Sequence, residues 1–325
     1  MRAIHVSTPG GPEKLELRDV PPPVPGEGEV LIDVKATALN RADLLQRRGV
    51  YPPPPGASDI LGLECAGVVA ALGPGVARAR VGERVMALLA GGGYAERTVV
   101  HERLLLPIPE RLSFEQAAAV PEAFLTATEA LFGVGRLVPG ECVLVHAAGS
   151  GVGTAALQLA REAGARIVAV ASGPKLEHLR ELARARFVDR TKDDFVAAVL
   201  EETSGRGADV IVDFVGAAYA ARHGECLAPL GRHVIVGLLG GAKAEIDLGR
   251  LLRQRQSILG MVMRTRPLAD KIAVVERFRR DFLHRLEDGR LVPVVDTVMR
   301  LEDARAAHKR MEANENVGKI VLSLA

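Results

Sequence analysis

Apolar and polar residues alternate in short runs through the first third of the chain. Strand-like runs occupy residues 2–6, 15–20, 29–39, 67–72, 84–88 and 95–100. Clusters of proline and glycine, such as residues 21–23 and 91–93, separate these runs as turns do. Ser113, followed by Gln116, has the spacing of a capping box and predicts a helix through Ala119. The pattern predicts an irregular, β-rich, barrel-like domain over residues 1–125.

The pattern changes near residue 126, where continuous apolar runs begin to alternate with amphipathic segments. We expect strands at residues 143–146, 167–171, 210–215, 233–237 and 258–261, and helices at about 153–163, 175–183, 193–203 and 219–227. This alternation is typical of an α/β fold with a doubly wound parallel (Rossmann) sheet. The expected elements after Pro267 no longer alternate in this way: a helix to about residue 286, a strand at 291–295, a helix at 301–311 and a strand at 319–322. The sequence therefore predicts a sheet domain over residues 126–261 and a discontinuous domain made of residues 1–125 plus 262–325.

A glycine-rich turn joins the first of these buried strands to the helix after it. The positions of a dinucleotide fingerprint G-x-G-x-x-G hold Ala148, Ser150 and Gly153, so two of the three glycines are replaced. An ordinary strand-to-helix turn is the alternative interpretation. The strand before the turn and the helix after it favour a phosphate site at the helix N-terminus, built by Ser150, Gly151, Val152 and Gly153.

The end of the next strand indicates which dinucleotide is bound. An NAD site carries a carboxylate about 20 residues after the glycines, whereas this chain has Ser172 and Lys175 there and no carboxylate until Glu177. Serine can donate a hydrogen bond to a 2′-phosphate and lysine can neutralise it, so we predict NADPH over NADH. The alternative is that Lys175 is a solvated residue of the first helical turn.

Ligands of such sheets bind at the carboxyl ends of the strands. This rule adds further candidate cofactor residues, namely Phe214, Val215, Gly237, Leu238 and Gly240. The alternative for the glycines is a plain turn.

Composition narrows the class of function. The 325 residues are 48% hydrophobic and 25% charged, with a formal net charge of +2 and no basic block, so we expect neither a nucleic-acid nor a membrane partner. We identify no apolar stretch long enough to span a bilayer. The three cysteines, Cys65, Cys142 and Cys226, are far apart, and with no signal peptide they favour a reducing, cytoplasmic location.

Motifs spread over nearly the whole chain resemble one family. They occupy residues 39–46, 51–55, 61–67, 81–86, 91–95, 121–127, 145–154 and 316–322. The chain resembles the zinc-independent quinone oxidoreductases of the medium-chain dehydrogenase/reductase superfamily, and most closely the mammalian tumour-suppressor-induced subgroup. The resemblance implies a GroES-like catalytic domain in two pieces around a Rossmann cofactor domain. It also implies a homodimer, or a tetramer, built through a strand near residues 257–261.

The resemblance also allows the positions of the zinc ligands to be compared with this sequence. The zinc enzymes of this superfamily use a cysteine where this chain has Asn40, and a Gly-His-Glu run where it has Gly62, Leu63 and Glu64. Asparagine and leucine do not replace thiolate and imidazole as zinc ligands, so we expect no metal. Without a Lewis acid an alkoxide is not stabilised, whereas a quinone or a conjugated enone needs only hydrogen-bond polarisation. We interpret Glu64 as structural.

Asn40 and Tyr51 are the candidate catalytic residues, because each could polarise the acceptor oxygen. Their alternatives are a helix cap for Asn40 and packing on the following prolines for Tyr51. The resemblance implies that Thr126 binds the nicotinamide carboxamide and that Asn316 and Lys319 contact the cofactor. The resemblance also places Arg190 where the subgroup has a tyrosine near the adenine, so Arg190 could stack there or contact the 2′-phosphate. His146 is expected to be packed, and Arg264 and Arg266 could shape acceptor choice.

The sequence thus predicts an NADPH-dependent enzyme that reduces quinones or other electron-poor conjugated carbonyls. One alternative is a 2-enoyl thioester reductase with Tyr51 as the acid. Another is a non-catalytic NADPH-binding protein with a structural or RNA-binding role.

Overall fold

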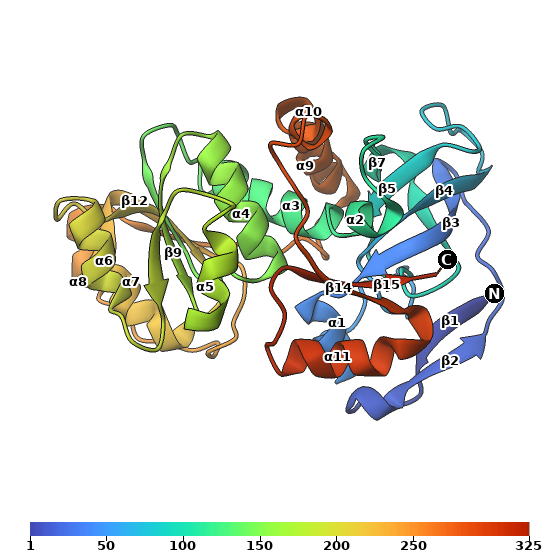
Figure 1. Cartoon of the computed structure of the whole chain (residues 1–325), viewed down its shortest axis with the longest axis horizontal. Helices are drawn as coiled ribbons and strands as arrows, with labels where there is room; N and C mark the ends of the chain where they lie inside the picture. The colour runs from blue at the N-terminus through green and yellow to red at the C-terminus, as the bar shows by residue number, and fades with distance from the viewer. Residues whose placement is uncertain (325) are drawn as a thin grey trace. The chain divides into compact units, whose positions relative to one another are not determined.

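The computed structural model describes residues 1–324 and contains two compact units (Figure 1). The first unit comprises Met1–Leu125 and Met263–Ala325, and the second comprises Thr126–Val262. These bounds lie within one residue of those expected from the sequence. The α/β class, with a β-rich unit and a doubly wound parallel-sheet unit, is confirmed.

The first unit is built on a mixed sheet with the strand order β14-β15-β3-β4-β5-β7, in which β6 also pairs with β3. The strands are β3 (Glu29–Ala38), β4 (Glu64–Leu72), β5 (Arg84–Leu88), β6 (Arg97–His101), β7 (Leu105–Pro107), β14 (Val295–Arg300) and β15 (Lys319–Ser323), with a separate hairpin of β1 (Arg2–Val6) and β2 (Leu15–Asp19). β15 runs antiparallel to β3, with Val321 opposite Ala38. This register brings the start of the last strand beside the residues that follow β3.

The first unit contains α-helices in addition to this sheet. They are α1 (Arg41–Arg47), α2 (Phe114–Ala118), α9 (Leu268–Asp281), α10 (Leu283–Glu287) and α11 (Ala304–Glu312). Of these, α2 packs against the central strands β3 and β4. The capping box predicted at Ser113 is confirmed, since Ser113 Oγ accepts from Gln116 N at 3.2 Å and Gln116 Oε1 accepts from Ser113 N at 3.1 Å. The sequence did not identify α1.

Two expectations for the last third of the chain are wrong. The helix expected to run to residue 286 ends at Asp281, because Phe282 has φ −135° and a new helix begins after it. The strand expected at residues 291–295 instead begins at Val295 and continues to Arg300. Leu291 N donates to Arg285 O at 2.8 Å, and Pro293 has no N–H to donate, so pairing with β15 starts only at Val295.

One segment is long and apolar enough to span a bilayer, contrary to the expectation from the sequence. The segment Phe114–Val134, which includes α2 and α3 (Pro121–Thr128), has 21 residues, and its most apolar 18-residue window has a mean hydropathy of 1.2. Of its most apolar window, 78% is buried inside the protein. Burial of this extent is typical of a core helix.

The second unit is a parallel six-stranded sheet with the order β10-β9-β8-β11-β12-β13. Its strands are β8 (Cys142–Val145), β9 (Arg166–Ala171), β10 (Arg186–Asp189), β11 (Ala208–Asp213), β12 (Leu227–Ile235) and β13 (Ser257–Gly260). Figure 1 shows α4 (Gly151–Glu162) and α5 (Gly173–Leu179) on one side of the sheet, and α6 (Phe195–Glu202), α7 (Ala220–Cys226) and α8 (Leu248–Gln254) on the other. The sequence did not identify β10 or α8. β10 has only four residues, of which two are buried.

Candidate functional site

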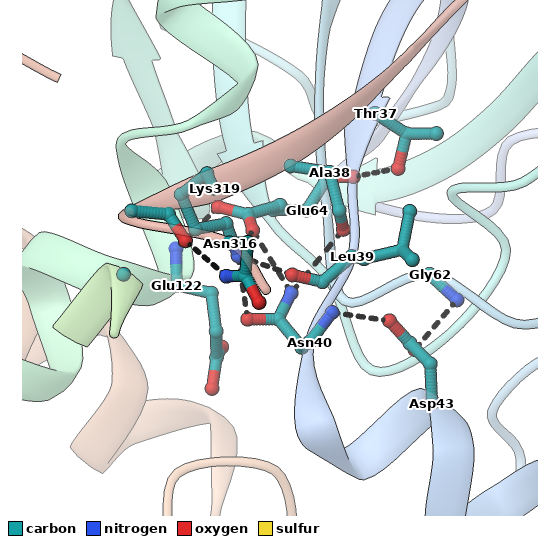
Figure 2. Close-up of polar contacts among 12 residues, drawn as sticks. Thr37, Ala38, Leu39, Asn40, Asp43, Gly62, Glu64, Glu122, Asn316 and Lys319 are labelled. Carbon is teal, nitrogen blue, oxygen red and sulfur yellow. Dashed lines mark hydrogen bonds and ion pairs between the residues drawn. The ribbon is translucent and has the colours of Figure 1, made fainter. Parts of the chain in front are cut away.

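Asn40, Glu64 and Lys319 meet at one point of the first unit (Figure 2). Asn40 is the N-cap residue of α1, just after β3, while Glu64 begins β4 and Lys319 begins β15. Because β15, β3 and β4 are neighbours in the sheet, the fold brings these three polar side chains together.

The Lys319 ammonium group is fully paired inside the protein. Its Nζ lies 2.6 Å from Leu39 O, 2.7 Å from Asn40 Oδ1 and 2.6 Å from Glu64 Oε1. Lys319 is 4% exposed and Glu64 is fully buried. An ammonium group has three N–H donors, and each finds an acceptor here. Lys319 therefore has no free N–H group for the predicted contact with the cofactor. We assign this residue first to holding Asn40 and Glu64.

The Glu64 carboxylate holds several parts of the site in place. Its Oε1 accepts from Asn40 Nδ2 at 2.9 Å, and its Oε2 accepts from Glu122 N, in the first turn of α3, at 2.8 Å. Asn40 Nδ2 also donates to Ala38 O at 3.3 Å. Both amide hydrogens of Asn40 are thus used within the protein. If Asn40 polarises an acceptor, as predicted, one of these bonds must be exchanged for it.

Asp43 links the cluster to a second line of buried polar groups. Its carboxylate accepts from Asn40 N at 2.7 Å, Gly62 N at 3.2 Å and the Tyr94 hydroxyl at 3.2 Å. The Tyr94 hydroxyl lies 3.2 Å from His308 Nε2. Complete burial raises the pKa of Asp43 to about 6 despite these donors. These contacts give Asp43 a structural role, because its carboxylate binds only groups inside the protein.

The raised pKa of Asp43 predicts a distinct pH dependence of stability. With a pKa of 3.8 in the unfolded chain and about 6 in the folded one, the folded state binds the proton more tightly. Its contribution to stability is therefore complete below about pH 4 and is lost as the pH rises through about 6, by up to about 3 kcal/mol. In urea unfolding, the stability difference between wild type and Asp43→Asn should decrease by roughly this amount from pH 4 to pH 7.

The free energy of unfolding must be compared with that of a variant, because the buried histidines change stability with pH in the opposite direction to Asp43. Burial lowers the pKa values of His146, His223 and His308 to about 3, so their contribution is lost as the pH falls. A difference between wild type and Asp43→Asn that stays constant from pH 4 to pH 7 would contradict the raised pKa.

Tyr51 lies under a buried arginine. The Arg264 guanidinium carbon is 5.4 Å from the centre of the Tyr51 ring, and the guanidinium donates to Ala90 O at 2.8 Å and Gln46 Oε1 at 2.7 Å. Partial burial raises the pKa of Tyr51, while Arg264 acts against that rise. Within residues 1–324, nothing hydrogen-bonds the Tyr51 hydroxyl. The role of Tyr51 as a donor to an acceptor oxygen stays a prediction, and Arg264 fixes the loop that carries it.

The glycine-rich turn of the second unit has the geometry of a phosphate cradle. Ser150 is the N-cap of α4, and its Oγ accepts from Gly153 N at 3.0 Å. Among the described residues, none accepts from the backbone N–H groups of Gly151 and Val152. A Cβ on Gly153 would lie 2.4 Å from Ala147 O, so only glycine lets the helix approach the turn this closely. These features fit a dinucleotide pyrophosphate.

The candidate residues for the 2′-phosphate lie beside this turn. The Lys175 side chain passes over Gly149, since its Cδ is 2.9 Å from the place of a Cβ there. Ser172 is the N-cap of α5, but its hydroxyl makes no capping bond. Arg190 donates its backbone N–H to Ala171 O at 2.9 Å, which places it next to the end of β9.

Asp189, which sequence reasoning missed, lies at the same place. Its carboxylate is 2.4 Å from the position of a Cβ on Gly173 and also accepts from Thr191 N at 3.0 Å and Thr191 Oγ1 at 2.7 Å. These hydrogen bonds lower the pKa of Asp189. β10, whose last residue is Asp189, was not identified from the sequence, so no sequence distance indicated this carboxylate.

The remaining cofactor candidates form one double turn at the ends of β11 and β12. Gly240 N donates to Val215 O at 2.7 Å, and Leu239 N donates to Phe214 O at 3.1 Å. Gly237 packs against Phe214, and Leu238 is exposed. Of the other candidates, Thr126 is buried in α3, and Asn316 Nδ2 donates to Gly318 O at 2.7 Å in the turn before β15. The structure brings the predicted members of this turn together. Their contacts with a cofactor stay predictions.

Family models and known proteins match this chain along its length. An alcohol dehydrogenase GroES-like domain matches residues 26–110, and a zinc-binding dehydrogenase domain matches residues 151–279. A quinone oxidoreductase of Pseudomonas aeruginosa is 34% identical over 328 residues, with 99% of both chains covered. The synaptic vesicle membrane protein VAT-1 homolog of Rattus norvegicus is 33% identical over 341 residues, covering 99% of this chain and 84% of its own length.

Solved structures with the same fold carry several activities in their names. An NAD-dependent alcohol dehydrogenase is 35% identical with a TM-score of 0.86, and all of both chains is covered. A quinone oxidoreductase of Pseudomonas syringae is 33% identical with a TM-score of 0.87, covering 99% of each chain. The CurK enoyl reductase is 28% identical with a TM-score of 0.86, covering 99% of this chain and 98% of its own.

Proposed function

Because the chain belongs to the medium-chain dehydrogenase/reductase superfamily of oxidoreductases, we propose that it transfers hydride from NADPH to quinones or other electron-poor conjugated carbonyls without a metal. The observation that carries the proposal is the Asn40–Glu64–Lys319 cluster. Where the zinc enzymes have their cysteine ligand, this chain has an amide that is held by an ammonium group and a carboxylate. The buried Leu63 takes the place of the histidine ligand.

The donor set does not suit zinc. A catalytic zinc ion needs three good protein ligands and one open position, whereas the Asn40 amide oxygen already accepts from Lys319 and the Leu63 side chain has no donor atom. An acceptor that needs no Lewis acid is therefore favoured. Bound NADPH would supply the hydride. Tyr51, with its free hydroxyl, would donate a hydrogen bond or a proton to the acceptor oxygen, and Arg264 would keep its ring in place.

The proposed preference for NADPH rests on Ser172 and Lys175 beside the phosphate cradle. The carboxylate of Asp189 is the main observation against this preference. A carboxylate near a 2′-phosphate repels it, but Asp189 is already hydrogen-bonded to Thr191 and lies against Gly173. Lys175→Glu should lower NADPH affinity at least tenfold, about 1.4 kcal/mol, and change NADH affinity much less, because only NADPH has the extra phosphate. Titration of the purified protein with each dinucleotide measures both.

The matched control is Lys309→Glu, an exposed lysine of the first unit, which should leave both affinities unchanged. Equal losses for NADPH and NADH in Lys175→Glu would mean that this lysine contacts a part common to both. Tighter binding of NADH by the wild type would remove the NADPH proposal and favour Asp189 as a ribose ligand.

An acceptor panel tests the reaction itself. NADPH oxidation is measured with quinones, enones and enoyl thioesters, for the wild type and for Tyr51→Phe. Turnover with quinones by the wild type, together with its loss in a variant that no longer binds NADPH, supports the proposal. Turnover only with enoyl thioesters, abolished in Tyr51→Phe, would support the second candidate, a 2-enoyl thioester reductase. The free Tyr51 hydroxyl and the similarity to an enoyl reductase favour that candidate. NADPH binding without any turnover would favour a structural role.

We also propose that the enzyme is cytoplasmic and forms a homodimer through the edge of the six-stranded sheet. β13 is the last strand of this sheet, and apolar side chains near it are exposed: Leu248 (70%), Leu252 (77%) and Ile258 (36%). An exposed edge strand with apolar neighbours is a usual site of association.

Leu252→Glu should therefore convert a dimer to a monomer, as measured by light scattering after gel filtration. The equally exposed Val24→Glu in the first unit is the control and should stay dimeric. A monomeric wild type would contradict this part of the proposal, and a tetramer would require a second interface.

A further inference from the structure

Four polar side chains are buried together inside the second unit, in a place that the proposed reaction does not use. Asp213 ends β11, His233 lies in β12, His223 lies in α7 and His146 follows β8. All four are at most 3% exposed. The aromatic rings of Phe195 and Tyr219 pack around His146 and His223. The surroundings are therefore mostly apolar, where polar groups need partners.

The Asp213 carboxylate is held in a fixed orientation. Its Oδ1 accepts from Val215 N at 2.7 Å and from Gly216 N at 3.0 Å. Its Oδ2 points at two imidazoles, with His233 Nε2 at 2.9 Å and His223 Nδ1 at 3.6 Å. Oδ1 is thus hydrogen-bonded to the backbone turn, and Oδ2 faces the two histidines.

The imidazole nitrogens of this group are not all satisfied. His146 Nε2 and His223 Nε2 lie 2.9 Å apart, so one of them donates to the other. His146 Nδ1 and His223 Nδ1 are buried without a hydrogen-bond partner among residues 1–324. A neutral imidazole has one N–H and one lone pair, and it is the form that binds metals.

We propose that Asp213, His223 and His233 together bind one divalent transition-metal ion of the zinc class. Their ligand atoms all lie within 4.8 Å of one another. Zinc bonds of about 2.0–2.2 Å place tetrahedral ligands roughly 3.4 Å apart, which lies between the two distances from Asp213 Oδ2. Two imidazoles and one carboxylate are donors that zinc accepts, whereas magnesium and calcium prefer oxygen alone.

The remaining groups fit as the outer shell of such a site. With the metal on His223 Nδ1, the Nε2–H of His223 would donate to His146 Nε2, which is the usual support of a metal-bound histidine. The Val215 and Gly216 N–H groups orient the carboxylate ligand from the other side. The ion would join β11, β12 and α7, and through Asp213 it would steady the turn at which we place the cofactor. The role is structural, and it departs from the expectation of no metal drawn from the sequence.

Because the group is closed to solvent, the ion must enter while the chain folds. The experiment therefore unfolds the full-length protein in denaturant with a chelator, removes both, and refolds it with Zn²⁺, with Mg²⁺ or with no metal. After gel filtration, metal content and thermal unfolding are measured. We expect one zinc per chain, no magnesium, and a midpoint at least about 5 °C higher with zinc than without metal.

Refolding with Co²⁺ identifies the ligands. Nitrogen and oxygen ligands give visible d–d bands without thiolate charge transfer, which separates this site from the free cysteines Cys65, Cys142 and Cys226. His223→Leu should lose stoichiometric zinc, whereas the exposed His178→Leu should keep it. If His223→Leu does not fold, the wild-type cobalt spectrum and its displacement by Zn²⁺ decide.

Two results would overturn the proposal. One is wild-type protein that refolds with Zn²⁺ to the native circular dichroism spectrum but holds well under 0.1 zinc per chain. The other is stoichiometric zinc that persists in His223→Leu. In both cases the four side chains would be a plain hydrogen-bonded network that positions the Val215–Gly216 turn. Neither result depends on the proposed reductase activity, because the readouts are metal content and stability.

Discussion

Lys319→Met is expected to destabilise the protein by about 3–5 kcal/mol, because it leaves the buried Glu64 carboxylate without its cation. The Lys319 Nζ to Glu64 Oε1 distance is 2.6 Å, and Glu64 is completely buried. The loss of the ammonium group also frees Asn40 Oδ1 and Leu39 O, which lose their donor. Denaturation with guanidinium, followed by circular dichroism because the chain has no tryptophan, measures the change.

Two further variants make this result specific. The exposed Lys309→Met, in α11 of the same unit, should change stability by no more than about 0.5 kcal/mol. The double variant Lys319→Met with Glu64→Gln should recover part of the loss, because no charge is then left buried without a partner. If Lys319→Met were as stable as Lys309→Met, the ion pair would not hold the site together, and the assignment of Lys319 to the cofactor would regain support.

The sequence could predict the residues of the site better than the bonds between them. Asn40 was identified from the position it shares with a metal ligand, and Glu64 was interpreted as structural. The structure places both in one hydrogen-bonded group with Lys319. The contact between Lys319 and Asn40 spans 279 residues and depends on the pairing of β15 with β3. No periodicity within either segment contains that information, since strand pairing is decided by tertiary packing.

The same limit explains which residues of the candidate cofactor site the sequence could indicate. The glycine-rich turn was identifiable because a strand, a turn and a helix follow one another in the sequence. Asp189 was missed because it comes from a different strand, and only the neighbouring positions of β9 and β10 bring its carboxylate to Gly173. His223 and His233 were missed for a similar reason, since β11, β12, α7 and the residue after β8 all contribute to that group. The sequence indicated only His146, as a packed residue.

Continuous apolar runs predict the sheet strands of the second unit most accurately. Four sheet strands of the second unit, β8, β9, β11 and β13, lie within two residues of their expected places, because buried parallel strands are continuous apolar runs. β12 begins at Leu227, six residues before its expected start. The errors fall on short or irregular elements such as β10 and the segment before β14. In both, local propensity is weak, and packing against a neighbouring strand decides the conformation.

Gly153→Ala should have the second large effect, with stability lowered by about 1–3 kcal/mol and NADPH affinity lowered at least tenfold. The new Cβ would lie 2.4 Å from Ala147 O and 2.7 Å from Ala148 Cα. Both are backbone atoms, so the first turn of α4 must move away from the phosphate cradle. Thermal unfolding and dinucleotide titration measure the two effects on the same samples.

Gly224→Ala is the control that makes this prediction informative, because it is the same substitution in the same unit with the opposite expected sign. Gly224 lies within α7, and a Cβ there meets nothing within 4 Å. Alanine in the interior of a helix is favoured over glycine by about 0.5–1 kcal/mol, so this variant should be more stable and should bind NADPH as the wild type does. If Gly153→Ala behaved like Gly224→Ala, the close approach of α4 to the turn would not be what builds the cradle. The dinucleotide would then have to be held mainly by the double turn at the ends of β11 and β12.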